Sequence, residues 1–326
     1  MMESHDGVVS SFRLLTVITI GDVILDRYWW GEASRLSPEA PVPVLLKRRV
    51  TALPGGAANA AANAAALGAR VELMGVVGED GEAQELRRAL AERAIDAGAL
   101  ISSPDRPTTT KTRLIAEHQQ LLRVDEEDTS AISAAVAERV LAGFRERVRA
   151  ADAVIVSDYA KGLLTNDLLS ELLAEAKRAG KPVFIDPKGH DALRYRGAAF
   201  LKPNRLELGI LVKRPVKNHT DTLSAGRELR DMLGGTNLLV TEAADGMSYF
   251  GVAGEEYHVT SQTRQVFDIT GAGDTVIASF ALAIAAGAPV PDAMRIASIA
   301  AELTIAKLGA ATVSPDELSK ALAHPR

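Results

Sequence analysis

The octet "DITGAGDT", residues 268–275, places a carboxylate at the start of an apolar run, "VIASFALAIAAGA", that predicts a buried helix. A helix begins with unpaired backbone amides and the positive end of its dipole, and glycines let the chain turn those amides toward an anion. The amides of Gly271, Ala272, Gly273 and Asp274 could therefore converge on one negative group. A carboxylate beside an anion is unfavourable unless it takes a proton from a nucleophile that attacks the anion, as in phosphoryl transfer to an alcohol. The alternative is an aspartate that only caps a helix after a glycine turn.

A second glycine pair lies far upstream, in "PGGAANAAANAAALGA" (54–69). Gly55 and Gly56 precede an alanine-rich helix with Asn59 in its first turn, and Asp22 ends the first predicted strand. Backbone amides, a carboxamide and a carboxylate can all hydrogen-bond the hydroxyls of a sugar. We therefore predict a sugar site from these four residues. A tight turn that only packs the helix, with an aspartate that caps a turn, is the alternative.

Short apolar runs alternate with helical patterns along the chain. Strands are expected at 14–21, 70–78, 152–158, 181–187, 198–204 and 236–243, and helices at 56–69, 81–94, 165–179 and 220–233. This alternation indicates a three-layer α/β/α fold, in which helices cover both faces of a mostly parallel central sheet. Such sheets bind ligands beyond the carboxyl ends of their strands, where "KPNRLE" (202–207) and "TEAADGM" (241–247) lie.

Two stretches interrupt this alternation. Residues 27–50 contain both tryptophans and prolines at positions 38, 41 and 43, and residues 107–124 have the pattern of a β-hairpin. Because proline confines a strand to an edge, we expect two segments, about 22–50 and 105–125, to form a small β lid beside the main sheet. Surface excursions without a role are the alternative. Residues 1–12 are expected to be a frayed tail, and 1–326 to be one domain.

Composition excludes several classes of protein. The chain has no cysteine, which rules out disulfides and thiolate catalysis, and its six histidines are not arranged as H-E-x-x-H. The net charge of −5 argues against a nucleic-acid surface. The sequence contains no P-loop, no protein-kinase motif set and no G-x-G-x-x-G dinucleotide motif. Since neither a signal peptide nor a membrane span is recognisable, we expect a cytoplasmic protein without membrane partners.

The two glycine sites together resemble those of the ribokinase-like, or PfkB-type, sugar kinases. The likeness lies in "PGGAANAAANAAALGARVELMGVVGEDG" near the start and "DITGAGDT" near the end, and it extends over residues 14–315. Each motif alone is moderately specific, whereas the two in this order and at this distance are a strong signal. The resemblance implies a ribokinase-like fold and a carbohydrate kinase that uses ATP and Mg²⁺.

Four further stretches look like a narrower family, the D-glycero-β-D-manno-heptose-7-phosphate kinases. They are residues 21–45, "SDYAKGLL" (157–164), "DPKG" (186–189) and "KLGAATVSPDEL" (307–318). This resemblance implies phosphorylation of the anomeric C1 hydroxyl of the heptose 7-phosphate to the 1,7-bisphosphate, toward the ADP-heptose of the lipopolysaccharide core. Many relatives carry a following nucleotidyltransferase domain. Because the chain stops at Arg326 without an H-x-G-H motif, we expect the stand-alone kinase.

The resemblance also assigns roles within the motifs. It implies that Asp274 is the general base and that residues 271–273 hold the transferred phosphoryl group. It implies that Asn204 and Glu207 hold Mg²⁺ through water, although Glu207 alone could be a solvated acid at a helix start. Residues expected on the nucleotide are Asn204, Arg205, Leu206, Glu207, Thr241, Glu242, Gly246 and Ser298. Relatives often have asparagine where Ser298 stands, and Asp245-Gly246 is also a good turn signal.

A phosphate at the far end of the sugar needs cations. The candidates are Arg113, Lys161 and Lys188, with Arg35 and Lys111 as further possibilities, and each could instead be a solvated surface charge. The resemblance favours the two lysines in its distinctive motifs, Lys161 and Lys188.

The lid is expected to close over the sugar and exclude water. Its open strand edges need covering, and Trp29, Trp30 and the run "VPVLL" indicate that the lid of a second subunit covers them, which gives a homodimer. Tryptophans packed within their own lid are the alternative.

Two other functions stay open. A PfkB-type kinase for another sugar, such as fructose or ribose, or for a nucleoside, would not require the basic residues. A catalytically silent sugar-binding regulator would have no use for a carboxylate among the glycines of residues 271–274.

Overall fold

The structure is a computed structural model that describes residues 5–117, 119–261, 270–307 and 311–324. Within these ranges the main sheet consists of nine strands, β1 (Thr16–Gly21), β4 (Arg70–Gly78), β5 (Leu100–Ser103), β8 (Ala153–Ser157), β9 (Val183–Asp186), β10 (Phe200–Leu201), β11 (Asn237–Thr241), β12 (Met247–Phe250) and β13 (Glu256–Val259). Their order in space is β13-β12-β11-β10-β9-β8-β1-β4-β5. Neighbours run parallel except for the antiparallel pairs β11/β12 and β12/β13.

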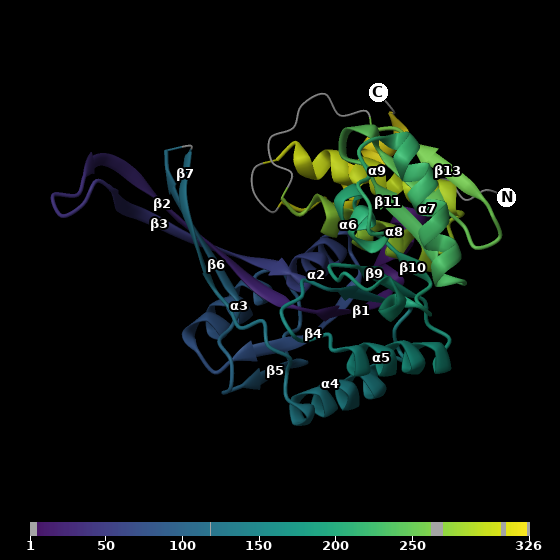
Figure 1. Ribbon diagram of the computed structural model, residues 1–326, viewed down its shortest axis with the longest axis horizontal. Helices are drawn as coiled ribbons and strands as arrows, with labels where there is room; N and C mark the ends of the chain where they lie inside the picture. Colours follow the sequence, from purple (N-terminus) through teal and green to yellow (C-terminus); the bar gives the residue numbers. More distant parts are fainter. Residues whose placement is uncertain (1–4, 118, 262–269, 308–310, 325–326) are drawn as a thin grey trace.

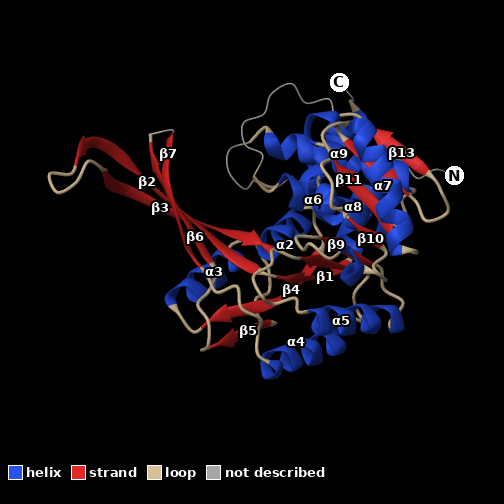
Figure 2. Ribbon diagram, viewed as in Figure 1, coloured by secondary structure: helices blue, strands red, loops and turns tan. Residues whose placement is uncertain are grey.

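Helices cover both faces of this sheet (Figures 1 and 2). One face carries α1 (His5–Ser11), α2 (Ala57–Ala66), α3 (Gly81–Ala91), α8 (Ala272–Ala285), α9 (Val290–Ile305) and α10 (Pro315–Ala323). The other carries α4 (Ala134–Arg147), α5 (Asn166–Arg178), α6 (Arg205–Leu211) and α7 (His219–Leu233). Short 3₁₀ helices are η1 (Phe12–Leu14), η2 (Ala192–Tyr195) and η3 (Ala243–Asp245). The expected three-layer architecture is therefore confirmed.

The inner strands are mostly apolar because helices cover them on both sides. In β1, Val17 packs into the core on one face, and Ile18 and Ile20 pack into the core on the other. Successive side chains of a strand point to opposite faces, but here both faces exclude water. Polar residues therefore concentrate where the strands end, and this edge is where the parallel sheet can hold a ligand.

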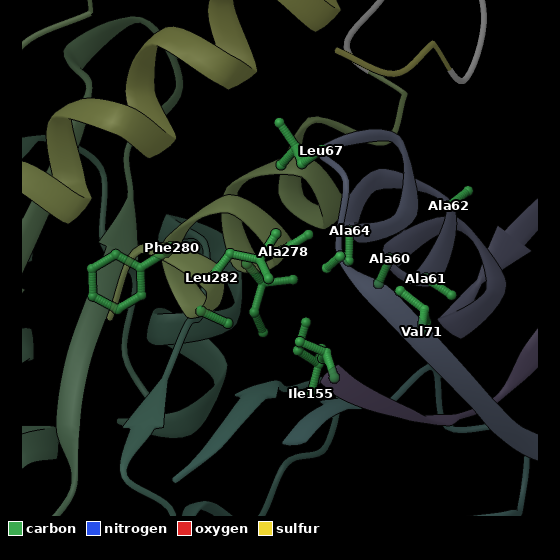
Figure 3. Packing of buried hydrophobic residues seen from close by; sticks show 14 of the residues in the cluster. Ala60, Ala61, Ala62, Ala64, Leu67, Val71, Ile155, Ala278, Phe280 and Leu282 are labelled. Carbon is green, nitrogen blue, oxygen red and sulfur yellow. The ribbon is translucent and has the colours of Figure 1, made fainter. Parts of the chain in front are cut away.

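Alanine lets α2 and α8 approach closely (Figure 3). The alanines of α2 that are fully buried are Ala57, Ala58, Ala60, Ala61 and Ala64. They share one core with Ala278 and Leu282 of α8. Each helix is preceded by a glycine with positive φ, Gly56 at 58° and Gly271 at 81°. The packing thus places the two glycine motifs, which are more than two hundred residues apart, beside each other.

The lid is a separate four-stranded sheet that projects away from the main body (Figure 1). Its strands, in the order β3-β2-β6-β7, are β2 (Val23–Leu36), β3 (Pro43–Gly56), β6 (Thr110–Ala116) and β7 (Gln119–Glu126). The expected segments form it, and the proline-containing strand β3 lies at an edge, as proline requires. The hairpins β2/β3 and β6/β7 are antiparallel, whereas β2 and β6 pair in parallel.

The amino-terminal segment corrects the expectation of a frayed tail at 1–12. Residues 5–11 form α1, and Val8, Val9 and Phe12 are buried in the core beside α10, so this segment is held by apolar packing. Residues 1–4 of that expectation lie outside the described residues. Over the described ranges, no helix combines the length and the apolar character that a membrane span requires.

We predict that Gly226→Ala destabilises the fold. Gly226 of α7 lies against the ring of Phe250 in β12, and an added Cβ would overlap that ring. Overpacking of this kind costs about 1–3 kcal/mol. Gly81→Ala is the matched control, because a Cβ at Gly81 has no atom within 4 Å. Thermal unfolding should show a lower midpoint for Gly226→Ala only, and equal midpoints for the two variants would contradict this packing.

Candidate active site

A cavity of about 250 Å³ opens at the carboxyl ends of β8 to β11. The residues that line it are Asp158, Tyr159, Asp186, Pro187, Lys188, Lys202, Asn204, Glu207, Thr241, Gly271, Gly273 and Asp274. They come from the segments that follow four neighbouring strands and from the first turn of α8. This is the edge at which parallel α/β sheets bind their ligands.

Asp274 lies in the first turn of α8 with only 4% of its surface exposed. The Nδ2 of Asn59, from α2, donates to its Oδ2 at 2.6 Å, and the hydroxyl of Tyr159 donates to its Oδ1 at 3.1 Å. Burial, and then the charge of Asp186, raise the pKa of Asp274 to about 7, although both hydrogen bonds and the charge of Lys202 favour the carboxylate. A carboxyl group with this pKa can accept a proton near neutral pH.

The start of α8 faces the cavity through Gly271 and Gly273. A Cβ at Gly271 would lie 2.6 Å from the Nδ2 of Asn59, and φ is 81° there, so glycine is needed both for the turn and for the close approach of α2. A Cβ at Gly273 would lie 3.3 Å from the Nζ of Lys202. A lysine ammonium therefore lies beside the positive end of α8, and together they favour an anion at this point.

Lys202 and Asp186 form a buried ion pair at 3.0 Å. Burial disfavours the ammonium, but the charges of Asp186 and Glu207 outweigh it and raise the pKa of Lys202. Burial also raises the pKa of Asp186, against the attraction of Lys202. Each charge is retained in the low-dielectric interior because its partner is there, so removing one partner leaves the other uncompensated.

Asn204 and Glu207 form a capping box at the start of α6. The Oδ1 of Asn204 accepts from the amide of Glu207 at 2.9 Å, and the Oε2 of Glu207 accepts from the amide of Asn204 at 2.9 Å. The other oxygen, Oε1, accepts from Lys188 at 3.1 Å. With Asp186 they bring carboxylate and amide oxygens to one cavity, and Mg²⁺ prefers oxygen ligands while keeping several waters. These residues fit a magnesium ion held mainly through water.

Of the other residues expected on the nucleotide, Thr241 lines the cavity. Gly246 has φ at 95° and a Cβ there would overlap the carbonyl of Val259, so it is needed for the turn between β11 and β12. Leu206 is 74% exposed, outside the cavity lining. Ser298 is buried in α9 and donates to Glu302 at 3.3 Å.

Arg205 and Glu242 are ion-paired at 3.0 Å. Arg205 also contacts Asp245 at 2.6 Å, so its guanidinium closes the turn that follows β11. The carboxylate of Glu242 is fully buried and does not line the cavity. For both residues, contact with a nucleotide stays a prediction.

The predicted sugar residues divide into two groups. Asn59 reaches Asp274, whereas the carboxylate of Asp22 accepts backbone N–H groups of Tyr159 at 2.9 Å, Lys161 at 3.0 Å and Leu163 at 3.2 Å. In this structure Asp22 orders the loop that carries Tyr159, because all three bonds go to that loop.

Gly55 and Gly56 end β3, directly before α2. A Cβ at Gly55 would overlap the carboxylate of Asp26, and one at Gly56 would overlap the carbonyl of Asp22. The glycine pair therefore allows β3 to approach β2 where the two strands meet the main body. Sugar contacts of Asp22 and of both glycines stay predictions.

The three main candidate cations are each paired with an acidic residue. Arg113 contacts Asp26 at 2.5 Å, Lys161 contacts Glu127 at 2.7 Å, and Lys188 contacts Glu207. Lys188 lines the cavity, whereas Arg113 and Lys161 are not among its described lining residues. Any phosphate that they bind must share these cations with the carboxylates.

The sequence reasoning missed three polar residues around the base, namely Tyr159, Asp186 and Lys202. The sequence did contain a sign that Asp186 and Lys202 belong to the site, because each stands at the carboxyl end of a predicted strand, as Asp22 does. Tyr159 lies in a loop whose path depends on Asp22, and no local pattern indicates that its hydroxyl reaches Asp274. Asp268 and Ile269, the first residues of the octet, lie outside the described residues.

Comparison with known families and proteins agrees with this geometry. The profile of the pfkB family carbohydrate kinases matches residues 15–317. The chain is 41% identical over 316 residues to the bifunctional protein HldE of Gluconobacter oxydans (strain 621H), covering 97% of this chain and 66% of that protein. It is 42% identical over 307 residues to the protein of the same name from Aliivibrio fischeri (strain MJ11), covering 94% of this chain and 63% of that protein. The chain thus spans slightly less than two thirds of these relatives.

Solved structures share the fold. The ribokinase of Arabidopsis thaliana, solved with ribose and ATP, superposes with a TM-score of 0.76 at 22% identity, covering 95% of this chain and 99% of that one. The phosphofructokinase-2 of Escherichia coli, solved with substrates and products, has a TM-score of 0.76 at 19% identity, covering 95% and 98%. The expected ribokinase-like fold with a small lid is confirmed, and the chain belongs to the pfkB family of carbohydrate kinases.

Proposed function

We propose that this kinase transfers the γ-phosphoryl group of ATP to the anomeric C1 hydroxyl of D-glycero-D-manno-heptose 7-phosphate, which gives the 1,7-bisphosphate. The observation that carries the chemistry is a buried carboxylate with a pKa of about 7 at the glycine-rich start of α8. The choice of sugar rests on the four distinctive stretches of sequence and on the relatives named HldE. The product would serve the synthesis of ADP-heptose for lipopolysaccharide, in the cytoplasm.

In the proposed reaction Asp274 accepts the proton of the C1 hydroxyl while the hydroxyl oxygen attacks the γ-phosphorus. The bond between that phosphorus and the bridging oxygen of the β-phosphate breaks, and ADP leaves with the electron pair. We propose that the amides of Gly271, Ala272 and Gly273, with the ammonium of Lys202, stabilise the transferring group; the support is that Gly271, Gly273 and Lys202 line the cavity. Asn59 and Tyr159 keep the carboxylate oriented through their hydrogen bonds.

Mg²⁺ bound near Asp186, Asn204 and Glu207 would neutralise phosphate charge. Glu207 is already oriented by its hydrogen bond to the amide of Asn204, so the capping box that begins α6 also positions a carboxylate on the cavity. Lys188, which pairs with Glu207, is the one of the three main candidate cations among the described lining residues of the cavity. For the phosphate on the far end of the sugar, Arg113 and Lys161 remain our candidates.

The lid supports the proposal of a homodimer. It exposes several large aliphatic side chains, Leu36, Val42, Leu46, Val50, Leu122 and Val124. The tryptophans, in contrast, have partners within their own lid: Trp30 stacks on Tyr28 and donates to Thr51, and Lys47 lies over Trp29. The aliphatic residues, which lie on the strands of the lid and in the loop between β2 and β3, are therefore the surface we propose a second lid to cover.

An ADP-release assay over a panel of sugars tests the reaction. Heptose 7-phosphate should give the highest kcat/KM, well above fructose 6-phosphate, ribose and nucleosides. Asp274→Asn should lower kcat by roughly 10²–10⁴-fold, because it removes the proton acceptor, and should leave sugar binding in place. Asp167→Asn, at an exposed position in the first turn of α5, is the matched control with unchanged rate. Preference for another sugar would refute the substrate, and full activity of Asp274→Asn would refute the base.

The pH dependence of kcat/KM should reflect the pKa of Asp274. Since the carboxylate is the active form, kcat/KM should fall as the pH drops below about 7. Asn59→Leu removes a hydrogen bond that stabilises the carboxylate, so the pKa should rise and the acidic limb should move up by about one to two pH units. Asn166→Ala, on the exposed surface of α5, should leave the profile unchanged. An acidic limb unmoved by Asn59→Leu would argue against Asp274 as the titrating group.

The homodimer is tested by light scattering after size-exclusion chromatography. The natural chain should elute as a dimer, and the double variant Leu46→Glu with Leu122→Glu should elute as a monomer, because four charges per dimer would be buried. Val252→Glu places a charge on an equally exposed aliphatic position outside the lid and should remain dimeric. A monomeric natural chain, or a double variant that stays dimeric, would exclude this interface.

A further inference from the structure

A second group of potential ligand atoms lies outside the cavity lining, around Glu242. Within the described part of the chain, His219, Glu242 and His258 bring one donor atom each to within 4.8 Å of one another. The Nδ1 of His219 lies 3.1 Å from the Oε2 of Glu242, and the Nδ1 of His258 lies 3.8 Å from its Oε1. The three residues come from the first turn of α7, the position directly after β11 and the edge strand β13, so only the folded chain assembles them.

The ligand atoms of these three residues suit Zn²⁺ better than the Mg²⁺ that we propose for the kinase reaction. Two imidazole nitrogens and one carboxylate oxygen are common ligands of Zn²⁺, with bonds of about 2.0–2.2 Å. In a tetrahedron with such bonds the ligand atoms are about 3.3–3.6 Å apart. The two distances from a histidine Nδ1 to a carboxylate oxygen of Glu242, 3.1 and 3.8 Å, lie on either side of this spacing. Mg²⁺, in contrast, takes oxygen ligands in an octahedron.

The carboxylate is held in place by neighbours, as metal-binding carboxylates are. Arg205 donates to its Oε2 at 3.0 Å, and Ser248 donates to its Oε1 at 2.5 Å. The Oγ of Ser248 also lies 2.9 Å from the Nδ1 of His258, so without metal this hydroxyl contacts both side chains, and its bond to Glu242 remains when Nδ1 binds an ion. The side chain of Glu242 is 0% exposed, so its position depends on the core rather than on solvent.

The histidines provide the route for an ion from solvent. Their side chains are 39% exposed at position 219 and 29% exposed at position 258. The ring centroids are 4.4 Å apart, so the two rings lie next to each other beside the carboxylate. Arg205 and Ser248 already satisfy the buried carboxylate, so a salt bridge alone does not require two imidazole nitrogens directed at it.

We propose that His219, Glu242 and His258 bind one Zn²⁺ ion, with a water molecule as the fourth ligand. Each imidazole binds through an unprotonated Nδ1, and any proton on that nitrogen passes to the buffer when the metal binds. The bound ion links α7, the turn that follows β11, and β13. Since Arg205 joins this turn to α6, the zinc site stabilises the part of the fold that carries Thr241 and Asn204.

The test is a zinc titration of the full chain against a chromophoric chelator, with excess Mg²⁺ present throughout. One Zn²⁺ per chain should bind, and zinc should raise the thermal unfolding midpoint. His258→Gln should weaken binding at least about tenfold and remove the thermal shift, because one of three protein ligands is lost. His190→Gln, at an exposed histidine on another loop, is the matched control and should bind as the natural chain does.

Cobalt substitution gives an independent measure. Co²⁺ should produce the strong visible absorption of a tetrahedral site in the natural chain and in His190→Gln, and not in His258→Gln. If His258→Gln lowers the unfolding midpoint even without metal, the zinc-binding comparison is made instead with His219→Gln, which removes the ligand in α7. The proposal is overturned if the natural chain binds no zinc at saturation, or if both ligand variants bind it as tightly as the control. None of these measurements uses kinase activity, so their outcome is independent of the proposed reaction.

Discussion

The close contact between α2 and α8 is the constraint on which the cavity depends. Alanines along α2 remove the side-chain bulk that would separate the two helices, and two hydrogen bonds one turn apart set their register. Asn59 donates to Asp274 at 2.6 Å, and Thr275 donates to Asn63 at 2.8 Å. A larger residue on the buried face of α2 would move Asn59 away from the carboxylate. The apolar packing of one helix pair thus positions the group that we propose to be the base.

The same buried environment creates a conflict between stability and chemistry. The pKa of Asp274 is raised from 3.8 to about 7 in the folded state, so the fold loses stability as the pH rises through this range, and the loss is complete above it. The ionised form is nevertheless the one that can accept a proton. Lys202, paired with Asp186, offsets part of the negative charge at the start of α8. The cavity therefore surrounds the carboxylate that we propose to be the base with fixed hydrogen bonds and one buried cation.

Asp22 contributes to the site indirectly in this structure, because it orders a neighbouring loop. It stands at the end of β1 next to Gly21, where a sequence pattern indicates a ligand-binding carboxylate. The structure instead directs its oxygens to three amides of the loop 159–163, and this loop brings Tyr159 to Asp274. A strand-end aspartate can bind a ligand or order a neighbouring loop, and only the path of that loop distinguishes the two.

By itself the sequence determined the three layers, the lid and the glycine-rich start of α8, because these depend on local periodicity, proline and glycine. It gave weaker signals for β13, which is short and exposed, and the pattern at residues 1–12 did not indicate that Val8 and Phe12 would be buried. Tertiary structure alone decided that Asn59 reaches Asp274 across 215 positions, that Lys202 pairs with Asp186, and that two histidines meet Glu242. Such contacts join residues from separate elements, so their distances follow from how helices and strands pack and cannot be obtained from the spacing of residues along the chain.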